Sequence, residues 1–225
     1  MKILIASATY SEIAPLAKKC SSSVVNGQYF FSLVHAETEI DILITGVGIA
    51  STAFHLGKAL SKTKYDYAFN FGIAGSFKKD IRIGDVVNVT TDIISELGAE
   101  NGNTFQKFDE LKMSAQTLKR TAYFVENKNE IQIPAVNEMF RVKGITVNTV
   151  HGHKTSIENI QRNFSPDVES MEGAAFLYAC RHEIIKCVQI RAISNYVEER
   201  NIESWDTALA IKNLNKVALR IINSF

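Results

Sequence analysis

The chain has 225 residues, of which 46% are hydrophobic and 22% are charged, and its formal net charge is +1. These values are ordinary for a globular protein and exclude the composition of a disordered chain. The balanced charge, without a basic stripe that carries interleaved aromatic residues, argues against nucleic acid or anionic lipid as a partner.

Nothing in the sequence directs the chain to a membrane or an oxidising compartment. No apolar run reaches the roughly 18 residues that a membrane span requires, so we expect no membrane partner. The N-terminus begins directly with a strand-like segment and carries no signal-peptide pattern. The three cysteines, Cys20, Cys180 and Cys187, lack the spacing of a zinc site and are expected to be free thiols. We therefore expect a cytoplasmic protein.

Short apolar runs rich in β-branched residues alternate with helical patterns along the chain. We predict strands at Lys2–Ala6, Tyr29–Ala36, Ile40–Thr45, Tyr67–Phe71, Asp85–Thr90, Lys143–Val150 and Cys187–Ser194. We predict helices at Ser51–Leu60, from a capping box at Thr155 to about Phe164, at Gly173–Glu183 and along the tail from Trp205. The alternation predicts an α/β fold, a single three-layer α/β/α domain over residues 1–225 with a mixed central β-sheet.

The region from Glu96 to Asn137 is the least regular and most polar part of the chain. We interpret it as an excursion over the sheet with one or two helices. Such segments commonly carry the walls of a binding pocket.

Polar and glycine-rich segments follow several predicted strands, where ligands bind in α/β sheets. Glu12 follows the first strand, and glycines stand at Gly46-Val47-Gly48 and at Gly72-Ile73-Ala74-Gly75. Glycines allow backbone amides to approach a ligand, although glycines after strands are often simple turns. The G-x-G-x-x-G pattern of a nicotinamide site is missing, so we expect no such cofactor.

Four polar residues are hard to explain by structure alone. A glutamate near a helix start is often only a partner of the helix dipole, and this reading competes for Glu12. Glu172 follows Met171 and precedes a helix of small residues, where its carboxylate can accept hydrogen bonds from a cis-diol. Arg191, on an apolar strand that ends at Asn195, needs a carboxylate partner if it is buried. Together they predict a site for a sugar and a heteroaromatic base.

A metal site is not expected. His151-Gly152-His153 is the only close pair of histidines, and no third ligand lies near it in the sequence. We interpret this segment as a loop at the rim of a pocket, and we expect neither a metal nor a cofactor.

These residues resemble the nucleoside phosphorylase and nucleosidase superfamily. The resemblance rests on Met171-Glu172, on Arg191 to Ser194-Asn195, on Gly72 to Gly75, on Gly84 to Val87 and on Glu12, and it covers nearly the whole chain. Within the superfamily, the segments Ser170–Phe176 and Ser194–Trp205 are most similar to the futalosine hydrolases.

The resemblance implies a mechanism in which a purine leaves and the sugar becomes positively charged. It implies that Glu12 orients and deprotonates the attacking water, that Met171 and Glu172 bind the ribose, and that Arg191 helps to hold the water network. Five residues near strand ends are expected to contact the base or to approach the substrate through their backbone: Gly72, Ala74, Gly75, Ser194 and Asn195. Negative carboxylates beside a developing sugar cation stabilise such a transition state.

Water is favoured over phosphate as the nucleophile. A phosphate dianion calls for arginines on the glycine segments, and these carry none. A carboxylate at Glu12 repels phosphate. One departure from the methylthioadenosine nucleosidases is that Ile73 stands where they usually have serine.

Asn195 stands where adenine-cleaving relatives have aspartate. Its amide can accept from N7–H and donate to O6 of a 6-oxopurine, whereas N7-protonated adenine presents two donors on that edge. A buried mismatch costs about 1–3 kcal/mol. We therefore predict hypoxanthine as the leaving base.

Futalosine carries an aromatic carboxylate on its 5′ side. Phe105, Phe108, Tyr123 and Phe140 are candidates for an apolar wall, although ordinary core or surface packing is the favoured interpretation of these residues. We expect Arg200 to pair with the carboxylate. The resemblance implies a homodimer or higher homo-oligomer. The alternatives are a methylthioadenosine or adenosylhomocysteine nucleosidase, a 6-oxopurine nucleoside phosphorylase, or a silent nucleoside-binding sensor on the same fold.

Overall fold

The structure is a computed structural model that describes residues 1–18, 23–24, 30–102, 104–119, 121–128 and 131–225. The predicted strand residue Tyr29 and the predicted free thiol Cys20 lie outside the described residues. Cys180 and Cys187 are buried thiols and form no disulfide within the described residues.

The strands build a mixed sheet in the order β11-β10-β6-β12-β5-β1-β4-β3-β2, with β9 paired to β6 and a separate β7–β8 hairpin. Their bounds are β1 (Lys2–Ser7), β2 (Ser23–Val24), β3 (Phe30–His35), β4 (Thr38–Ile44), β5 (Tyr67–Ser76), β6 (Val86–Ile94), β7 (Gly98–Asn101), β8 (Thr104–Lys107), β9 (Phe124–Glu126), β10 (Arg141–Thr146), β11 (Val168–Ser170) and β12 (Lys186–Tyr196).

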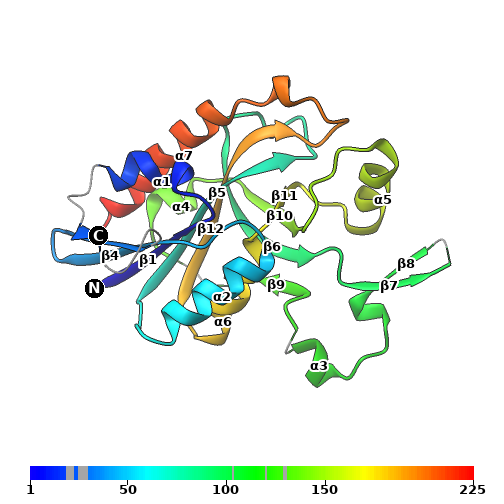
Figure 1. The fold of residues 1–225 in the computed structure, drawn as a ribbon, viewed down its shortest axis with the longest axis horizontal. Helices are drawn as coiled ribbons and strands as arrows, with labels where there is room; N and C mark the ends of the chain where they lie inside the picture. Colours follow the sequence, from blue (N-terminus) through cyan, green and yellow to red (C-terminus); the bar gives the residue numbers. More distant parts are fainter. Residues whose placement is uncertain (19–22, 25–29, 103, 120, 129–130) are drawn as a thin grey trace.

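Helices cover both faces of the sheet (Figure 1). The helices are α1 (Tyr10–Ala17), α2 (Ile49–Leu60), α3 (Ala115–Lys119), α4 (Pro134–Asn137), α5 (Lys154–Phe164), α6 (Gly173–His182) and α7 (Thr207–Ile222), with short 3-10 turns η1 (Phe108–Glu110) and η2 (Ile202–Ser204). None of the described helices is long and apolar enough to cross a bilayer.

Strand β1 explains why the sequence folds into layers. Its alternate residues Ile3 and Ile5 join a core with α1, α4 and α7, whereas Leu4 and Ala6 join a second core with α2 and α6. A strand buried on both faces reads as a continuous apolar run, which is why it was visible in the sequence. The predicted three-layer α/β/α fold with a mixed sheet is confirmed.

Part of the sheet closes on itself. Strand β11 pairs in parallel with β10 and antiparallel with β5, so β5, β12, β6, β10 and β11 form a ring. A small core with members from all five strands fills this ring: Ala74, Val87, Val89, Val142, Val168 and Ile193. The sequence did not predict β11, because three residues are too few for a periodic pattern.

Several predicted boundaries were wrong. The prediction ended a strand at Phe71, but β5 continues through Gly72–Gly75 because its backbone pairs with β12 as far as Ser76 and Tyr196. These glycines therefore lie in a strand and do not form a loop. Helix α5 begins after His153, one residue before the predicted capping box. Strand β10 ends at Thr146, so 147–153 connect it to α5.

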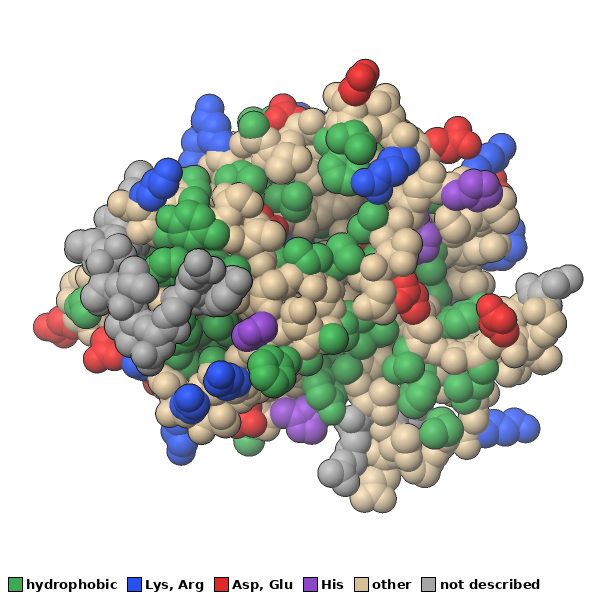
Figure 2. Space-filling model, viewed as in Figure 1, with side chains coloured by type: hydrophobic (Ala, Val, Ile, Leu, Met, Phe, Trp, Pro, Cys, Tyr) green, Lys and Arg blue, Asp and Glu red, His purple; other side chains and the backbone are tan. Residues whose placement is uncertain are grey.

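The excursion between residues 96 and 137 contains the two short helices α3 and α4, as predicted, but also the β7–β8 hairpin and β9, which were not predicted. The hairpin and α3 extend away from the central sheet (Figure 1). On the face shown in Figure 2, Lys and Arg side chains lie scattered around the periphery and do not gather over one element.

Candidate active site

A cavity of about 380 Å³ lies where the carboxyl ends of β1, β5, β11 and β12 meet. Most of the predicted site residues line it: Glu12, Ala74, Gly75, Met171, Glu172, Ser194 and Asn195. Trp205, Thr207 and Ile211, from η2 and α7, complete its wall. The described lining contains neither Lys nor Arg.

A larger cavity of about 500 Å³ lies between β9 and α6. Its described lining has one carboxylate, Glu126, which is paired with Lys128 at 3.2 Å. Without a second acid it offers no arrangement for cleavage of a glycosidic bond, so the chemistry is assigned to the smaller cavity.

Glu12 is held by the first turn of α1. The backbone N–H and the hydroxyl of Thr9, the helix N-cap, donate to its Oε2 at 2.9 and 2.8 Å. The N–H of Ile73 in β5 donates to its Oε1 at 3.1 Å. The side chain thus caps the helix and faces the cavity as well, so the structural reading and the functional reading of this glutamate are compatible.

Glu172 lies at the N-cap of α6. The N–H of Gly48 donates to its Oε1 at 3.1 Å, and Nη2 of Arg191 lies 3.9 Å from its Oε2. Burial raises the pKa of Glu172, Arg191 and the N–H of Gly48 oppose this rise, and the negative charge of Glu12 adds to it. The two acids are therefore close enough to influence each other.

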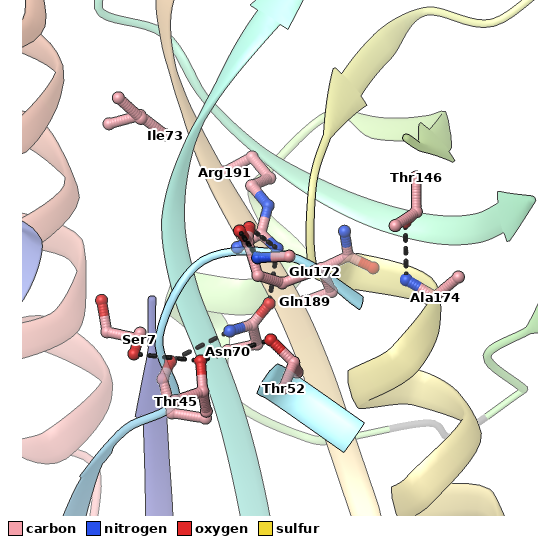
Figure 3. A network of polar contacts seen from close by, with 12 residues as sticks. Ser7, Thr45, Thr52, Asn70, Ile73, Thr146, Glu172, Ala174, Gln189 and Arg191 are labelled. Carbon is pink, nitrogen blue, oxygen red and sulfur yellow. Dashed lines mark hydrogen bonds and ion pairs between the residues drawn. The ribbon is translucent and has the colours of Figure 1, made fainter. Parts of the chain in front are cut away.

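Arg191 is fully buried behind the cavity, in the middle of β12. Its Nη2 donates to Oδ1 of Asn70 at 2.5 Å, so the guanidinium lies between Asn70 and Glu172 (Figure 3). A Cβ at Gly72 would lie 2.6 Å from Nη1 of Arg191 and 3.3 Å from Oε1 of Glu12. Gly72 is absent from the described lining of the cavity. Its lack of a side chain leaves room for the guanidinium of Arg191.

Asp92 is a further buried acid, and it supports the start of α6 that carries Glu172. Asp92 is fully buried, and it accepts hydrogen bonds from Thr146 Oγ1 at 2.8 Å and Gln189 Nε2 at 2.9 Å. Thr146 Oγ1 in turn accepts from the N–H of Ala174 at 2.8 Å, at the start of α6 (Figure 3). Burial raises the pKa of Asp92 to about 6, and these hydrogen bonds limit the rise.

Asn195 follows a bulge in β12, because the register with β5 shifts between Ile193 and Asn195. Its Nδ2 donates to the carbonyl of Tyr196 at 3.0 Å, and the hydroxyl of Ser194 donates to its Oδ1 at 2.7 Å. Since a backbone carbonyl only accepts hydrogen bonds, Tyr196 fixes which side of the amide carries the NH₂ group.

The residues proposed for a 5′ tail lie elsewhere. Phe105 packs against Phe164, and Phe108 packs against Tyr123, in a separate cluster beside β10 and α5. Phe140 is 75% exposed, and none of these side chains lines the cavity. These residues therefore have the core and surface packing that the sequence favoured and do not form a wall of the cavity.

Arg200 does not line the cavity either. Its guanidinium lies 5.5 Å from the ring centre of Trp205, which is a lining residue, and its N–H donates to the carbonyl of Gly152 at 3.2 Å. The arginine therefore lies near a lining residue without lining the cavity itself.

The sequence analysis missed a pair of lining residues, His151 and Glu169. Nδ1 of His151 lies 2.7 Å from Oε2 of Glu169, and the backbone N–H of His151 donates to Oε1 at 3.1 Å. His151 was interpreted only as part of a rim loop, and Glu169 was not singled out. An acid among the small and apolar residues of Val168–Ser170 was the one available signal.

No group of three His, Cys, Asp or Glu side chains in the described ranges is arranged to hold a metal ion.

Known proteins resemble this chain over most of its length. The futalosine hydrolase of Thermus thermophilus is 26% identical over 80% of this chain and 80% of its own length. A 5′-methylthioadenosine/S-adenosylhomocysteine nucleosidase of an Exiguobacterium species is 22% identical over 97% of this chain and 95% of its own length. A Helicobacter pylori methylthioadenosine nucleosidase, solved with 5′-methylthioadenosine in its active site, superposes with a TM-score of 0.82 at 20% identity, over 100% of this chain and 99% of the other.

These relatives support an enzyme with nucleosidase activity, and they do not separate futalosine from methylthioadenosine as its substrate. The model of the phosphorylase superfamily matches residues 2–223, nearly the entire chain. The chain therefore belongs to the phosphorylase superfamily.

Proposed function

We propose that this chain is a purine nucleosidase that hydrolyses the N-glycosidic bond of futalosine and releases hypoxanthine, as a step of menaquinone biosynthesis. One observation carries the proposal: Glu12 and Glu172, far apart in the sequence, face one cavity and influence each other electrostatically. Asn195 lines the same cavity. In the proposal its side-chain amide forms hydrogen bonds with the base.

The chemistry requires negative charge where the sugar becomes positive. As the C1′–N9 bond stretches, the ribosyl group gains positive charge, and preorganised carboxylates stabilise it without reorganising. In the proposal Glu12 takes a proton from the attacking water, whose oxygen bonds to C1′ as the C1′–N9 bond breaks, and N7 of the leaving base takes a proton from a second water. Glu172 accepts hydrogen bonds from ribose hydroxyls beside Met171, and Arg191 keeps Glu172 in place. Glu12 is anchored through four donors, on Ser7, Thr9 and Ile73, which suits a group that orients a water molecule.

Water is the proposed nucleophile. A phosphate dianion needs cationic donors, and the described lining holds none, while its three glutamates, Glu12, Glu169 and Glu172, repel an anion. The buried Arg191 is engaged with Asn70 and Glu172.

The base is assigned through the amide of Asn195. Its NH₂ group bonds the Tyr196 carbonyl and can give its second proton to O6, while Oδ1 can accept from N7–H. A flipped amide would set Oδ1 against the Tyr196 carbonyl, so adjustment to adenine is resisted. The mismatch with N7-protonated adenine costs about 1–3 kcal/mol.

A neighbouring subunit is part of the proposal. Val47 lines the cavity and is 52% exposed, and Phe54 on the adjoining helix α2 is 66% exposed. Exposed apolar side chains beside a site are typical of an interface. We therefore propose a homodimer or higher homo-oligomer, which light scattering after size-exclusion chromatography tests.

A substrate panel in phosphate-free buffer tests the function, with futalosine, inosine, methylthioadenosine and adenosylhomocysteine, and with the released base identified. Hypoxanthine released from futalosine supports the proposal. Phosphate-dependent cleavage of inosine overturns it in favour of a phosphorylase. Adenine release from methylthioadenosine favours the alternative nucleosidase, and tight binding without turnover favours a sensor.

A further inference from the structure

Glu169 is a buried acid in the cavity that the proposed mechanism does not use. It is 4% exposed, lies in the middle of β11 and contributes to the cavity wall. Both of its oxygens accept a hydrogen bond from His151, one from the backbone N–H and one from Nδ1. A carboxylate so anchored is fixed in place and offers only acceptor groups to its surroundings.

Glu169 lies beside Asn195. Strand β11 pairs with β5 so that Glu169 stands opposite Gly75. A Cβ at Gly75 would lie 3.2 Å from Nδ2 of Asn195 and 3.6 Å from Cγ of Glu169. The amide and the carboxylate therefore flank the same point of β5 and face the same cavity.

Each oxygen of Glu169 accepts one described hydrogen bond, and a carboxylate has room for about four. The wall next to Asn195 therefore presents an acceptor from Glu169, a donor from Nδ2 and an acceptor from Oδ1. A hypoxanthine that leaves protonated at N7 presents the complementary sequence along one edge: the N1–H donor, the O6 acceptor and the N7–H donor.

We propose that Glu169, held by His151, is a specificity-determining residue that accepts a hydrogen bond from N1–H of a 6-oxopurine. The inference rests on the proposed function, because it concerns the base that this cavity receives. Adenine carries a lone pair at N1, which would face the buried carboxylate without a proton between them. An unpaired buried acceptor is costly, especially when it is charged.

The test compares futalosine with its 6-amino counterpart, which differs only at C6 and N1. The quantity measured is the ratio of kcat/KM for the 6-oxo substrate to that for the 6-amino substrate. Damage to folding lowers both values together and leaves this ratio unchanged. Glu169→Gln can place its NH₂ group against N1 of adenine, so we expect the ratio to fall on the order of 10- to 100-fold.

Two further variants sharpen the test. His151→Phe keeps a ring but removes the Nδ1 anchor, so the ratio should fall by a smaller factor. Glu198→Gln removes a carboxylate from a surface ion pair with Lys79 and should leave the ratio as in the unmodified protein. An unchanged ratio in both Glu169→Gln and His151→Phe overturns the inference.

Calorimetric binding of free hypoxanthine and adenine separates this inference from the proposed function. Failure of the unmodified protein to cleave futalosine refutes the proposed substrate alone. The inference survives if the protein then still binds hypoxanthine more tightly than adenine and Glu169→Gln loses that preference. Equal binding of the two bases, or a preference that persists in Glu169→Gln, refutes it.

Discussion

The proposed function gives the cavity a sugar end, with Glu12 and Glu172, and a base end, with Asn195 and Glu169. The two ends are built differently. At the sugar end, Glu12 and Glu172 are fixed mainly by backbone N–H groups of Thr9, Ile73 and Gly48. At the base end, Asn195 and Glu169 present an ordered set of donors and acceptors.

The difference teaches what each end is for. In the proposed function, the sugar end places charge near a developing cation, and charge acts over several ångströms without exact pairing. In the same proposal, the base end must distinguish two purines of nearly equal shape, which requires matched hydrogen bonds. Changes at the sugar end should therefore alter the rate with every base, whereas changes at the base end should alter the choice of base.

The largest effect is expected from Glu12→Gln. Glutamine still accepts from Thr9 and fills the same space, but it cannot take a proton from water. We expect kcat to fall by about 10²- to 10⁴-fold with KM little changed. Steady-state kinetics measure this, with the unfolding temperature as a check on the fold. A kcat near that of the unmodified protein would remove Glu12 from the mechanism.

A smaller loss is expected from Glu172→Gln. The ribose loses a charged acceptor and Arg191 loses its partner, so kcat/KM should fall roughly 10- to 100-fold for every base. Because burial raises the pKa of Glu172, its carboxyl group ionises at a higher pH than an ordinary glutamate does. The acid limb of kcat/KM should therefore lie higher than an ordinary glutamate predicts.

Full pH profiles of both proteins check this assignment of the acid limb. In Glu172→Gln the limb should move to lower pH, since an amide does not titrate. A limb at the same pH in both proteins would assign it to another group.

Asn195→Asp should leave the rate largely intact and change the preferred base. An aspartate can carry the proton that a 6-aminopurine needs at N7, so the 6-oxo to 6-amino ratio should fall on the order of tenfold. Parallel kinetics with the two futalosine analogues provide the measurement. If the ratio stays constant, the amide does not read the base, and the contrast between the two ends fails.

Asp92→Asn should have the smallest effect on activity, because Asp92 lies behind both ends. Its folded pKa, about 6, exceeds the ordinary aspartate pKa of 3.8, so it stabilises the fold below pH 4 and loses that contribution as the pH rises through about 6. Relative to Asp92→Asn, the unmodified protein should lose about 2 kcal/mol of unfolding free energy between pH 4 and 7. Urea unfolding at both pH values measures it, and a constant difference would contradict the assignment.

The sequence predicted many of the residues that line the cavity, at both of its ends, but not the pair formed by Glu169 and His151. Glu12, Glu172 and Arg191 were found because polar residues after or within apolar strands are conspicuous, and the carboxyl ends of strands meet at one edge. The pairing of Glu169 with His151 was not visible, since it depends on a three-residue strand and on antiparallel contact with β5.

Other failures have the same physical origin. The segment 72–75 was placed after the end of a strand, although strand pairing with β12 overrides the low strand preference of its glycines. The aromatic residues Phe105 and Phe108 were candidates for a pocket wall by composition alone, and local hairpin geometry sends them to α5. Long-range pairing decided each case, and a single sequence carries little information about it.

The closure of the ring by β11 ties ligand occupancy to local rigidity. The seam consists of two residue pairs, Val168 with Ser76 and Glu169 with Gly75, so it is short enough to open independently of the rest of the sheet. A purine that contacts both strands would add its binding free energy to the free energy needed to separate them. A base that binds more tightly would then keep β11 and β5 paired for longer.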